Sequence, residues 1–366
     1  MINMTDSSIS KQLSFVDLAD VYAGYNYSDY NYEFDEATKP CQNVAVSSSV
    51  MIVLCAFDIL VFLLAVPGNL LVCFVIGLSK QPLSPSDIYL LHLAVADILL
   101  AFGLPFFATS NVVGWVFGNV MCKLVSVFQE ISFYSSILFL ACISVDRYLV
   151  IVHAMEAPKA ARRRLVSWGA CAAVWFVGSL LSLPVLFNEV EIPNGETLAM
   201  CSVNYAEEGQ DNWRLATRGL LHVLGFVLPL TIMLACYGVT VVRLLRTRGS
   251  FQRQKAMRVI MAVVVAFLLC WTPYHLVLMV DTLLRANLVK HRCQDKMAVD
   301  KALFATLSLG LFHSCVNPVL YAFVGEKFRR KLLQMLRKAG VFKRRASVTR
   351  ASRSISLTSE ATSTFM

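Results

Sequence analysis

The sequence is poor in charge: Asp, Glu, Lys and Arg make up only 16% of its 366 residues, against about 25% in a typical soluble domain. Hydrophobic residues reach 57%, more than the roughly 45–50% of soluble domains. Both departures argue against a soluble globular domain. The formal net charge of +9 does not indicate nucleic-acid binding, because the basic residues lie between apolar blocks and not on a soluble basic face. We therefore expect a membrane protein.

Seven apolar runs are long enough, at about 18 residues or more, to cross a bilayer as helices. They cover about 48–78, 87–112, 120–151, 165–187, 214–242, 257–280 and 302–324. The expected fold is an all-α membrane bundle of seven transmembrane helices. No apolar run precedes residue 40, so we expect no cleavable signal peptide and a first span that acts as its own insertion signal.

Basic residues concentrate on one side of the expected membrane. They occur in alternate connections and in the C-terminal tail, at Lys80, Lys159, Arg162, Arg163, Arg164, Arg243, Arg246, Arg248, Arg253, Lys255, Arg258, Lys327, Arg329, Arg330 and Lys331. The opposite side also has four basic residues between residues 290 and 301. The three connections and the tail named above nevertheless all place their basic residues on the same side of the membrane. The positive-inside rule then predicts a cytoplasmic C-terminus and an extracellular N-terminus.

Four segments follow from this topology. Residues 1–47 form an extracellular arm rich in acids and tyrosine, and residues 48–324 form the bundle. Residues 325–338 alternate apolar and basic side chains, which predicts an amphipathic helix lying on anionic membrane lipids. Residues 339–366 are rich in Ser and Thr and are expected to be a disordered cytoplasmic tail.

Four of the eleven cysteines fall on the expected outer side, namely Cys41, Cys122, Cys201 and Cys293. That side is oxidising, so we expect disulfides there. Sequence spacing alone leaves three ways to pair four cysteines. Asn3 and Asn26 begin Asn-x-Ser/Thr sequences on the same side and are candidate glycosylation sites.

Buried charge and proline mark the expected spans at particular places. Asp97 and Asn69 lie mid-helix, Asp146-Arg147-Tyr148 ends the third span, CWTP (270–273) lies in the sixth and NPVLY (317–321) ends the seventh. Charge inside a membrane is expensive and usually functional, although each motif alone could be a packing detail or a tolerated kink. Taken together, and in this order, they resemble the rhodopsin-like G-protein-coupled receptors.

This resemblance implies roles for single residues inside the bundle. Asp97, Ser136 and Asn317 would hold an allosteric sodium ion in the inactive state, since oxygen ligands suit a hard cation. Trp271 would form the rotamer-sensitive base of the ligand cavity, and Pro273 would give the sixth span a hinge. No other cofactor, metal or catalytic chemistry is expected.

The same resemblance assigns the cytoplasmic switch. Arg147 would pair with Asp146 in the inactive state and, with Tyr148 beside it, engage a G protein in the active state. Tyr321 would then repack inward. Arg253 occupies the end of the sixth span where some relatives have an acid, so no second lock on Arg147 is expected.

The family also implies a Cys122–Cys201 disulfide, and the remaining pair would be Cys41–Cys293. A bridge of that second kind is typical of chemokine receptors. Gln129 replaces the acid of amine receptors and Leu311 replaces the lysine of opsins, so neither a small amine nor retinal is expected as the ligand.

Local segments resemble chemokine receptors of the CXC group, and among them the interleukin-8 receptors. They are DRYLVIVHA (146–154), GWVFG (114–118), FLLCWTPYHLVLMVDTLLR (267–285) and HSCVNPVLYAFVGEKFR (313–329). By this resemblance Arg214, Arg218 and Asp281 would contribute to ligand recognition. The alternative for each is a solvated charge at a helix end.

This sequence departs from the CXC group at two places, a proline motif in the second span and an acidic residue in the seventh. Gly103-Leu104-Pro105 replaces the usual Thr-x-Pro of the second span, so the proline kink is kept without the threonine. Leu307 replaces an acid usual in the seventh span, while Asp58 appears in the first. We hypothesise that the acid has moved between these facing positions and that Asp58 points inward at an Arg or Lys of a ligand, because a carboxylate facing lipid would be costly.

The N-terminal arm is acidic within a basic protein. Residues 1–39 contain seven acids and two lysines, a local charge of −5. Such an arm would attract basic chemokines and raise their association rate. Tyr25, Tyr27, Tyr30 and Tyr32 lie beside acids in YNYSDYNYEFDE (25–36) and are candidate sulfation and ligand-binding sites. An ordinary disordered polar arm is the alternative.

The expected function is therefore a plasma-membrane receptor for CXC chemokines of the Glu-Leu-Arg type, acting through an inhibitory-class heterotrimeric G protein in leukocyte chemotaxis and calcium signalling. Receptor kinases and arrestin would act on the tail, and homo- or hetero-dimerisation stays open. The main alternative is a non-signalling scavenger receptor, although DRYLVIV is intact. A pump or transporter would need a chain of ionisable groups that the spans lack.

Overall fold

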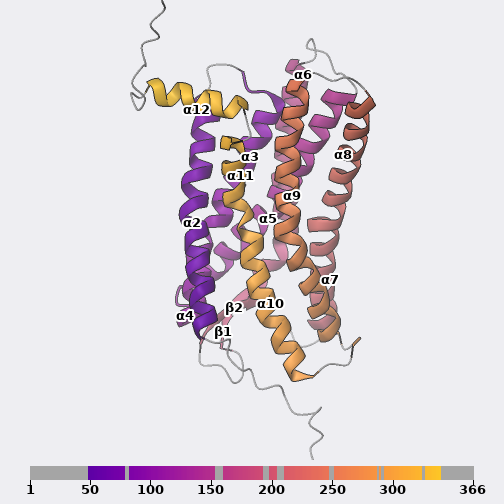
Figure 1. The fold of residues 1–366 in the computed structure, drawn as a ribbon. Coiled ribbons are helices and arrows are strands. Elements are labelled where there is room, and N and C mark those ends of the chain that lie inside the picture. Colours follow the sequence, from indigo (N-terminus) through magenta and orange to yellow (C-terminus); the bar gives the residue numbers. More distant parts are fainter. Residues whose placement is uncertain are drawn as a thin grey trace, which may run out of the picture. The chain divides into compact units, whose positions relative to one another are not determined.

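A computed structural model describes residues 48–78, 82–152, 160–192, 198–203, 210–246, 251–286, 288–289, 292–323 and 326–338. These residues lie in the unit Asn43–Met366. Within them, seven helical segments are long and apolar enough to cross a membrane, which confirms the expected all-α bundle (Figure 1).

Four spans are built on single helices and three on pairs. The single helices are α2 (Ser48–Gly77), α5 (Gly118–Val152), α6 (Ala160–Leu181) and α9 (Phe251–Arg285). The pairs are α3 (Pro85–Phe102) with α4 (Leu104–Val113), α7 (Gln210–His222) with α8 (Leu228–Arg246), and α10 (Cys293–Leu311) with α11 (His313–Phe323). Two short helices complete them, the 3₁₀-helix η3 (Leu183–Phe187) and the π-helix η4 (Val223–Val227).

The helices that carry the sixth and seventh spans, α9 and α10, begin earlier than the apolar runs predicted. Helix α10 begins at Cys293, where the Asp295 carboxylate accepts the backbone N–H of Arg292 at 3.0 Å. Such a contact satisfies a donor that the first turn of a helix leaves unpaired. These first turns are polar, so a search for hydrophobic runs does not detect them.

The break in the second span falls at Gly103, between α3 and α4. Pro105 follows at the start of α4, where its missing N–H costs no helical hydrogen bond. A Cβ placed on Gly103 would lie 2.5 Å from Oε1 of Gln129 on α5. A larger residue at position 103 would therefore require the Gln129 side chain to move, and the next atoms, at 3.5 Å, are in ordinary contact.

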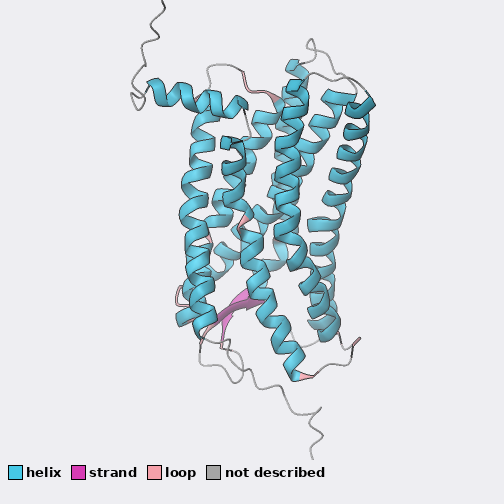
Figure 2. Cartoon of the chain, in the orientation of Figure 1, coloured by secondary structure: helices cyan, strands magenta, loops and turns pink. Residues whose placement is uncertain are grey.

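A two-stranded hairpin lies at one end of the bundle, as Figure 2 shows. Strand β1 (Asn188–Glu191) pairs antiparallel with β2 (Met200–Val203), with Val190 opposite Cys201. Cys201 is disulfide-bonded to Cys122 near the start of α5. We call this end the hairpin end.

The opposite end carries helix α12 (Glu326–Lys338), which lies against the ends of α2 and α11 and extends outward past α2 (Figure 1). Phe328 packs against the hydrophobic core, whereas Arg329 and Arg330 are exposed. Lys331 lies 3.6 Å from Asp87 at the start of α3. The expected amphipathic helix is present, and we call this end the α12 end.

Large apolar side chains cover the outside of the bundle. Phe74, Phe176 and Leu269 are 56%, 65% and 68% exposed. A soluble monomer rarely exposes apolar surface of this extent. The outer surface is therefore suited to lipid, and the polar groups that matter for function lie inside or at the two ends.

Candidate functional site

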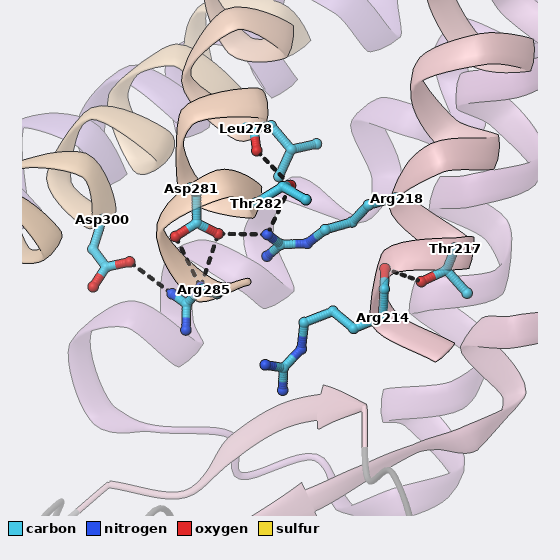
Figure 3. A network of polar contacts seen from close by, with 8 residues as sticks. All are labelled: Arg214, Thr217, Arg218, Leu278, Asp281, Thr282, Arg285 and Asp300. Atoms are coloured by element: carbon cyan, nitrogen blue, oxygen red, sulfur yellow. Dashed lines mark hydrogen bonds and ion pairs between the residues drawn. The ribbon is translucent and has the colours of Figure 1, made fainter. Parts of the chain in front are cut away.

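Asp281 is the centre of an ion-pair network at the hairpin end (Figure 3). Its side chain is fully buried, and its carboxylate accepts hydrogen bonds from Arg218 Nη1 at 2.6 Å and from Arg285 Nε at 2.8 and 2.9 Å. Burying a carboxylate is costly unless it is paired. Two guanidinium groups from α7 and α9 provide that pairing, so Asp281 is neutralised within the protein.

The network extends to a third span through Arg285. Its Nη2 donates to the Asp300 carboxylate of α10 at 2.9 Å, and both side chains are about one-third exposed, at 31% and 35%. Arg218 also donates to the Thr282 hydroxyl at 3.1 Å. The network thus joins the fifth, sixth and seventh spans and presents charges of both signs at its surface.

Sequence reasoning found Arg218 and Asp281 but missed Arg285 and Asp300. The i,i+4 spacing of Asp281 and Arg285 was a signal for their pairing on one helix face. No local signal pointed to Asp300. Arg214 lies one turn before Arg218 and is partly exposed; Figure 3 shows both guanidinium groups on the same side of α7.

Asp58 lies on α2 and is buried, with 6% of its surface exposed. Its carboxylate interacts with the hydroxyl of Ser308, the residue after Leu307 on α10. The Oδ1 atom has no hydrogen-bond partner among the described residues. The side chain therefore faces the seventh span, beside the position of the missing acid, and has no cationic partner within the part of the chain that the structure describes.

Asp97 is the centre of a second polar cluster, midway through the bundle. The Ser136 hydroxyl of α5 donates to its Oδ1 at 3.2 Å, and the Asn317 amide of α11 donates to its Oδ2 at 2.7 Å. The Asp97 carboxylate and the Ser136 hydroxyl supply oxygen atoms of the type that a hard cation prefers. These two residues fit a sodium ion, whereas Asn317 presents its nitrogen and would have to turn its amide to act as a ligand.

His313 of α11 joins this cluster to Trp271 of α9, which sequence reasoning did not foresee. The Trp271 Nε1–H donates to His313 Nδ1 at 3.1 Å, and His313 Nε2 lies 3.6 Å from Asp97 Oδ1. Trp271 is buried and packs against Phe133 with ring centres 4.7 Å apart. A Cβ on Gly310 would lie 2.9 Å from the Trp271 ring, so only glycine allows this packing.

Asp146 accepts three hydrogen bonds at the α12 end. Arg147 Nη2 lies 3.1 Å from its carboxylate, Arg163 Nη2 of α6 lies 2.7 Å away, and the Ser86 hydroxyl of α3 lies 2.8 Å away. The pair between Asp146 and Arg147 is therefore accompanied by a second arginine that the sequence did not indicate. Tyr148 follows on α5.

Two tyrosines lie deeper at this end. Tyr321 is buried, and its hydroxyl has no hydrogen-bond partner among the described residues. The hydroxyl of Ser144 on α5 donates to the hydroxyl of Tyr237 on α8 at 2.9 Å. Pro273 lies inside α9 without ending that helix.

Several predicted sites lie outside the described residues. They are Asn3, Asn26, Tyr25, Tyr27, Tyr30, Tyr32, Cys41 and the serines and threonines of the tail. The Cys122–Cys201 disulfide is present with a Cα–Cα distance of 5.6 Å. Cys293 is disulfide-bonded, and its pairing with Cys41 stays a prediction.

Known proteins resemble this chain over most of its length. Residues 68–321 match the family described as 7 transmembrane receptor (rhodopsin family). C-X-C chemokine receptor type 2 of Macaca mulatta is 44% identical over 324 residues, which cover 87% of this chain and 90% of that receptor. C-X-C chemokine receptor type 1 of Oryctolagus cuniculus is 46% identical over 305 residues, covering 82% and 84%. Type 1 of Homo sapiens is 44% identical over 324 residues, covering 87% and 90%.

Proposed function

Because the chain belongs to the rhodopsin family of seven-transmembrane receptors, and within it to the C-X-C chemokine receptors, we propose that it recognises chemokines with a Glu-Leu-Arg N-terminus. The observation that carries this proposal is the identity of 44% to 46% to receptors of types 1 and 2. The seven spanning segments among the described residues, together with the receptor family, make the chain a multi-pass protein of the plasma membrane. Its N-terminus would face outward, so the hairpin end would meet the ligand.

The ion-pair network around Asp281 suits such a ligand. A Glu-Leu-Arg segment carries one carboxylate and one guanidinium group, and the network offers partly exposed Arg218, Arg285 and Asp300. Exchange of internal ion pairs for ligand ion pairs would keep every buried charge neutralised. It would also loosen the contacts that join the fifth, sixth and seventh spans.

Asp58 would hold a second basic group of the ligand. One of its oxygens is buried without a partner among the described residues, which is a costly state for a carboxylate. A Lys or Arg entering from the hairpin end would remove that cost. The acid of the first span would then serve where Leu307 stands in the seventh.

Ligand binding would act on the helix bundle through Trp271 and Asp97. The contacts Trp271–His313 and Asp97–Asn317 connect the sixth, seventh and second spans. A sodium ion at Asp97 would supply a positive charge there and favour the inactive arrangement. Changing these contacts would shift the bundle toward a conformer in which the sixth span moves outward.

The α12 end would couple to an inhibitory-class heterotrimeric G protein. Arg147 would leave Asp146 and enter the G protein, while Arg163 continues to neutralise Asp146. Tyr321 would supply its hydroxyl, unpartnered among the described residues, to the new arrangement. Receptor kinases and arrestin would act on the Ser/Thr-rich tail, and the cellular results would be calcium release and leukocyte chemotaxis.

A panel of chemokines tests this function directly. Cells expressing the full chain are exposed to each chemokine, and both binding and G-protein activation are measured. We expect activation by chemokines with Glu-Leu-Arg and weaker activation by those without it. Binding without any activation would instead identify a scavenger receptor, and absence of binding would overturn the ligand class.

A further inference from the structure

Two histidines from different spans face one another, deeper in the bundle than the ion-pair network. His222 ends α7 and His275 lies on α9. Their Nδ1 atoms are 3.2 Å apart and their ring centres 5.3 Å apart. Both Nδ1 atoms therefore lie between the two rings, each directed at the other.

The surroundings of this pair are aromatic. Phe226 stacks on His275 with ring centres 4.3 Å apart, and Trp271 lies at 6.4 Å. His275 is buried, His222 is partly buried, and the Nε2 atoms of both have no hydrogen-bond partner among the described residues.

The spacing of the two nitrogens matches a metal site. Zn²⁺ binds imidazole nitrogen at about 2.0–2.1 Å in tetrahedral geometry, which separates two ligand atoms by roughly 3.3–3.4 Å. We propose that His222 and His275 form a binding site for a borderline divalent transition-metal ion such as Zn²⁺. Imidazole is a preferred ligand of Zn²⁺, Cu²⁺ and Ni²⁺.

Proton positions balance in this site without any change in net charge on the two rings. In the metal-free pair, one neutral ring donates its Nδ1–H and the other accepts through Nδ1. Binding uses the lone pairs of both Nδ1 atoms, so the donor ring moves its proton to Nε2. Each ring then carries one proton, on Nε2, and both remain neutral ligands.

The local charge permits a cation. Arg218 lies one turn before His222, but its guanidinium is paired with Asp281 at 2.6 Å. Glu130 of α5 is close enough to Tyr274, the neighbour of His275, to interact with it electrostatically. No group of three or more His, Cys, Asp or Glu among the described residues is placed to hold a metal, so water would fill the remaining positions.

A metal ion at this place would tie the fifth span to the sixth. His222 immediately precedes the π-helix η4, and His275 lies one turn after Trp271. An ion that binds only when the two rings face one another would favour the conformer described here over one in which the sixth span has moved away. The site would thus be an allosteric regulator, separate from the chemokine contacts.

Thermal unfolding of the purified full-length receptor tests this inference without any chemokine, so the result does not depend on the proposed function. ZnCl₂ at about 100 µM should raise the unfolding midpoint by a few degrees, because it binds only the folded state. MgCl₂ should have no such effect, since Mg²⁺ prefers oxygen ligands. His275→Gln and His222→Gln should each abolish the Zn²⁺ shift.

His92→Gln is the matched control, because His92 is also a partly buried histidine of the bundle and lies on α3. That variant should keep the full Zn²⁺ shift. No shift in the wild-type receptor, or an equal shift in the His222 and His275 variants, would overturn the site. If the variants do not fold, electron paramagnetic resonance of the Cu²⁺-loaded wild type decides: coupling to two nitrogen ligands supports the site, and oxygen ligands alone contradict it.

Discussion

Two buried carboxylates, Asp281 and Asp58, have opposite surroundings. Asp281 accepts hydrogen bonds from two guanidinium groups, whereas Asp58 has one oxygen without a partner among the described residues. The Asp281 carboxylate is therefore stabilised by ion pairs, whereas one buried oxygen of Asp58 has no such partner among the described residues. Single substitutions should separate these two roles.

Asp281→Asn should lower both stability and chemokine potency. The substitution leaves Arg218 and Arg285 facing one another without the shared negative charge. We expect a loss of about 2 kcal/mol in stability, from charged hydrogen bonds in a buried pair, and a lower potency in G-protein activation. The measurements are the thermal unfolding midpoint and the chemokine dose–response curve.

Asp300→Asn is the matched control for the predicted loss of stability. Asp300 contacts the same Arg285 but is 35% exposed, so its loss should cost at most about 1 kcal/mol. Equal losses of stability for the two variants would show that burial does not distinguish them.

Asp58→Asn should reduce chemokine potency about tenfold, which corresponds to roughly 1.4 kcal/mol, while leaving the unliganded receptor as stable or more stable. Removing an unpaired buried charge relieves a desolvation cost, but the basic group of the ligand loses its partner. Dose–response and thermal unfolding measure the two effects. Unchanged potency, together with reduced potency for Asp281→Asn, would contradict the proposed role of Asp58.

At the scale of elements, buried polar contacts connect spans that also pack against one another. Asp97 links α3 to α5 and α11, and Trp271 links α9 to α11 through His313. Buried polar contacts of this kind have few alternative arrangements, because every broken one must be replaced. Small shifts of one helix are therefore passed to its neighbours.

Gly310→Ala should destabilise the receptor and change its basal signalling. The new Cβ would lie 2.9 Å from the Trp271 ring, and overpacking of this kind costs about 1–3 kcal/mol. Trp271 must then move within its helix interface. Thermal unfolding and ligand-independent G-protein activation are the measurements.

Gly238→Ala provides the comparison, because no atom lies within 4 Å of a Cβ at that position of α8. The Gly238→Ala substitution should leave the thermal stability of the receptor unchanged or raise it slightly. A similar loss in both glycine variants would point to backbone effects and away from contact with Trp271.

Asp97→Asn should remove the effect of sodium on agonist binding. In the wild type, NaCl in place of choline chloride should weaken agonist affinity several-fold, because a cation at Asp97 would favour the inactive conformer. The variant keeps a similar shape but lacks the charge. Radioligand competition at constant ionic strength measures the difference, and a retained sodium effect would place the ion elsewhere.

At the scale of the whole molecule, we expect the membrane to separate an acidic arm from an excess of basic residues. The arm carries −5 over residues 1–39 while the chain carries +9 in total. With the arm outside, the excess of basic residues lies on the cytoplasmic side, where anionic lipids and the G protein would meet it. A basic chemokine would encounter the acidic arm before the bundle.

Replacing Tyr25, Tyr27, Tyr30 and Tyr32 by Phe should slow chemokine association. Sulfated tyrosines would add negative charge, and steering by charge acts mainly on the association rate. We expect about a tenfold slower association at low salt and a smaller difference at high salt. Surface plasmon resonance on captured receptor measures both rates; an unchanged association rate would remove the sulfation hypothesis.

Much of the fold could be predicted from the sequence, because a bilayer admits few solutions. Runs such as 48–78 had to be helices, since backbone groups in lipid must be paired within their own segment. The polar turns at the start of α10 could not be found in this way. They depend on capping by Asp295 and not on hydrophobicity.

The residues of the candidate site also fall into those that the sequence indicated and those that only the structure revealed. Asp97 and Arg147 stood out because charge inside apolar runs is rare, whereas Trp271 and Asp281 stood out through the resemblance of their segments to known receptors. His313, Arg163 and Asp300 did not stand out, because their importance lies in partners that are distant in sequence. The pairing of His222 with His275 is of the second kind.

By itself, the sequence determined that the chain crosses the membrane seven times, which family it resembles and which residue types lie within each span. Hydrophobic length and local motifs are properties of single segments, so they can be read without coordinates. Only the tertiary structure decided that Asp281 pairs with two arginines, that Asp58 has an oxygen without a partner among the described residues and that two histidines face one another. These facts depend on helix rotation and tilt, which packing between spans sets and which no single span encodes.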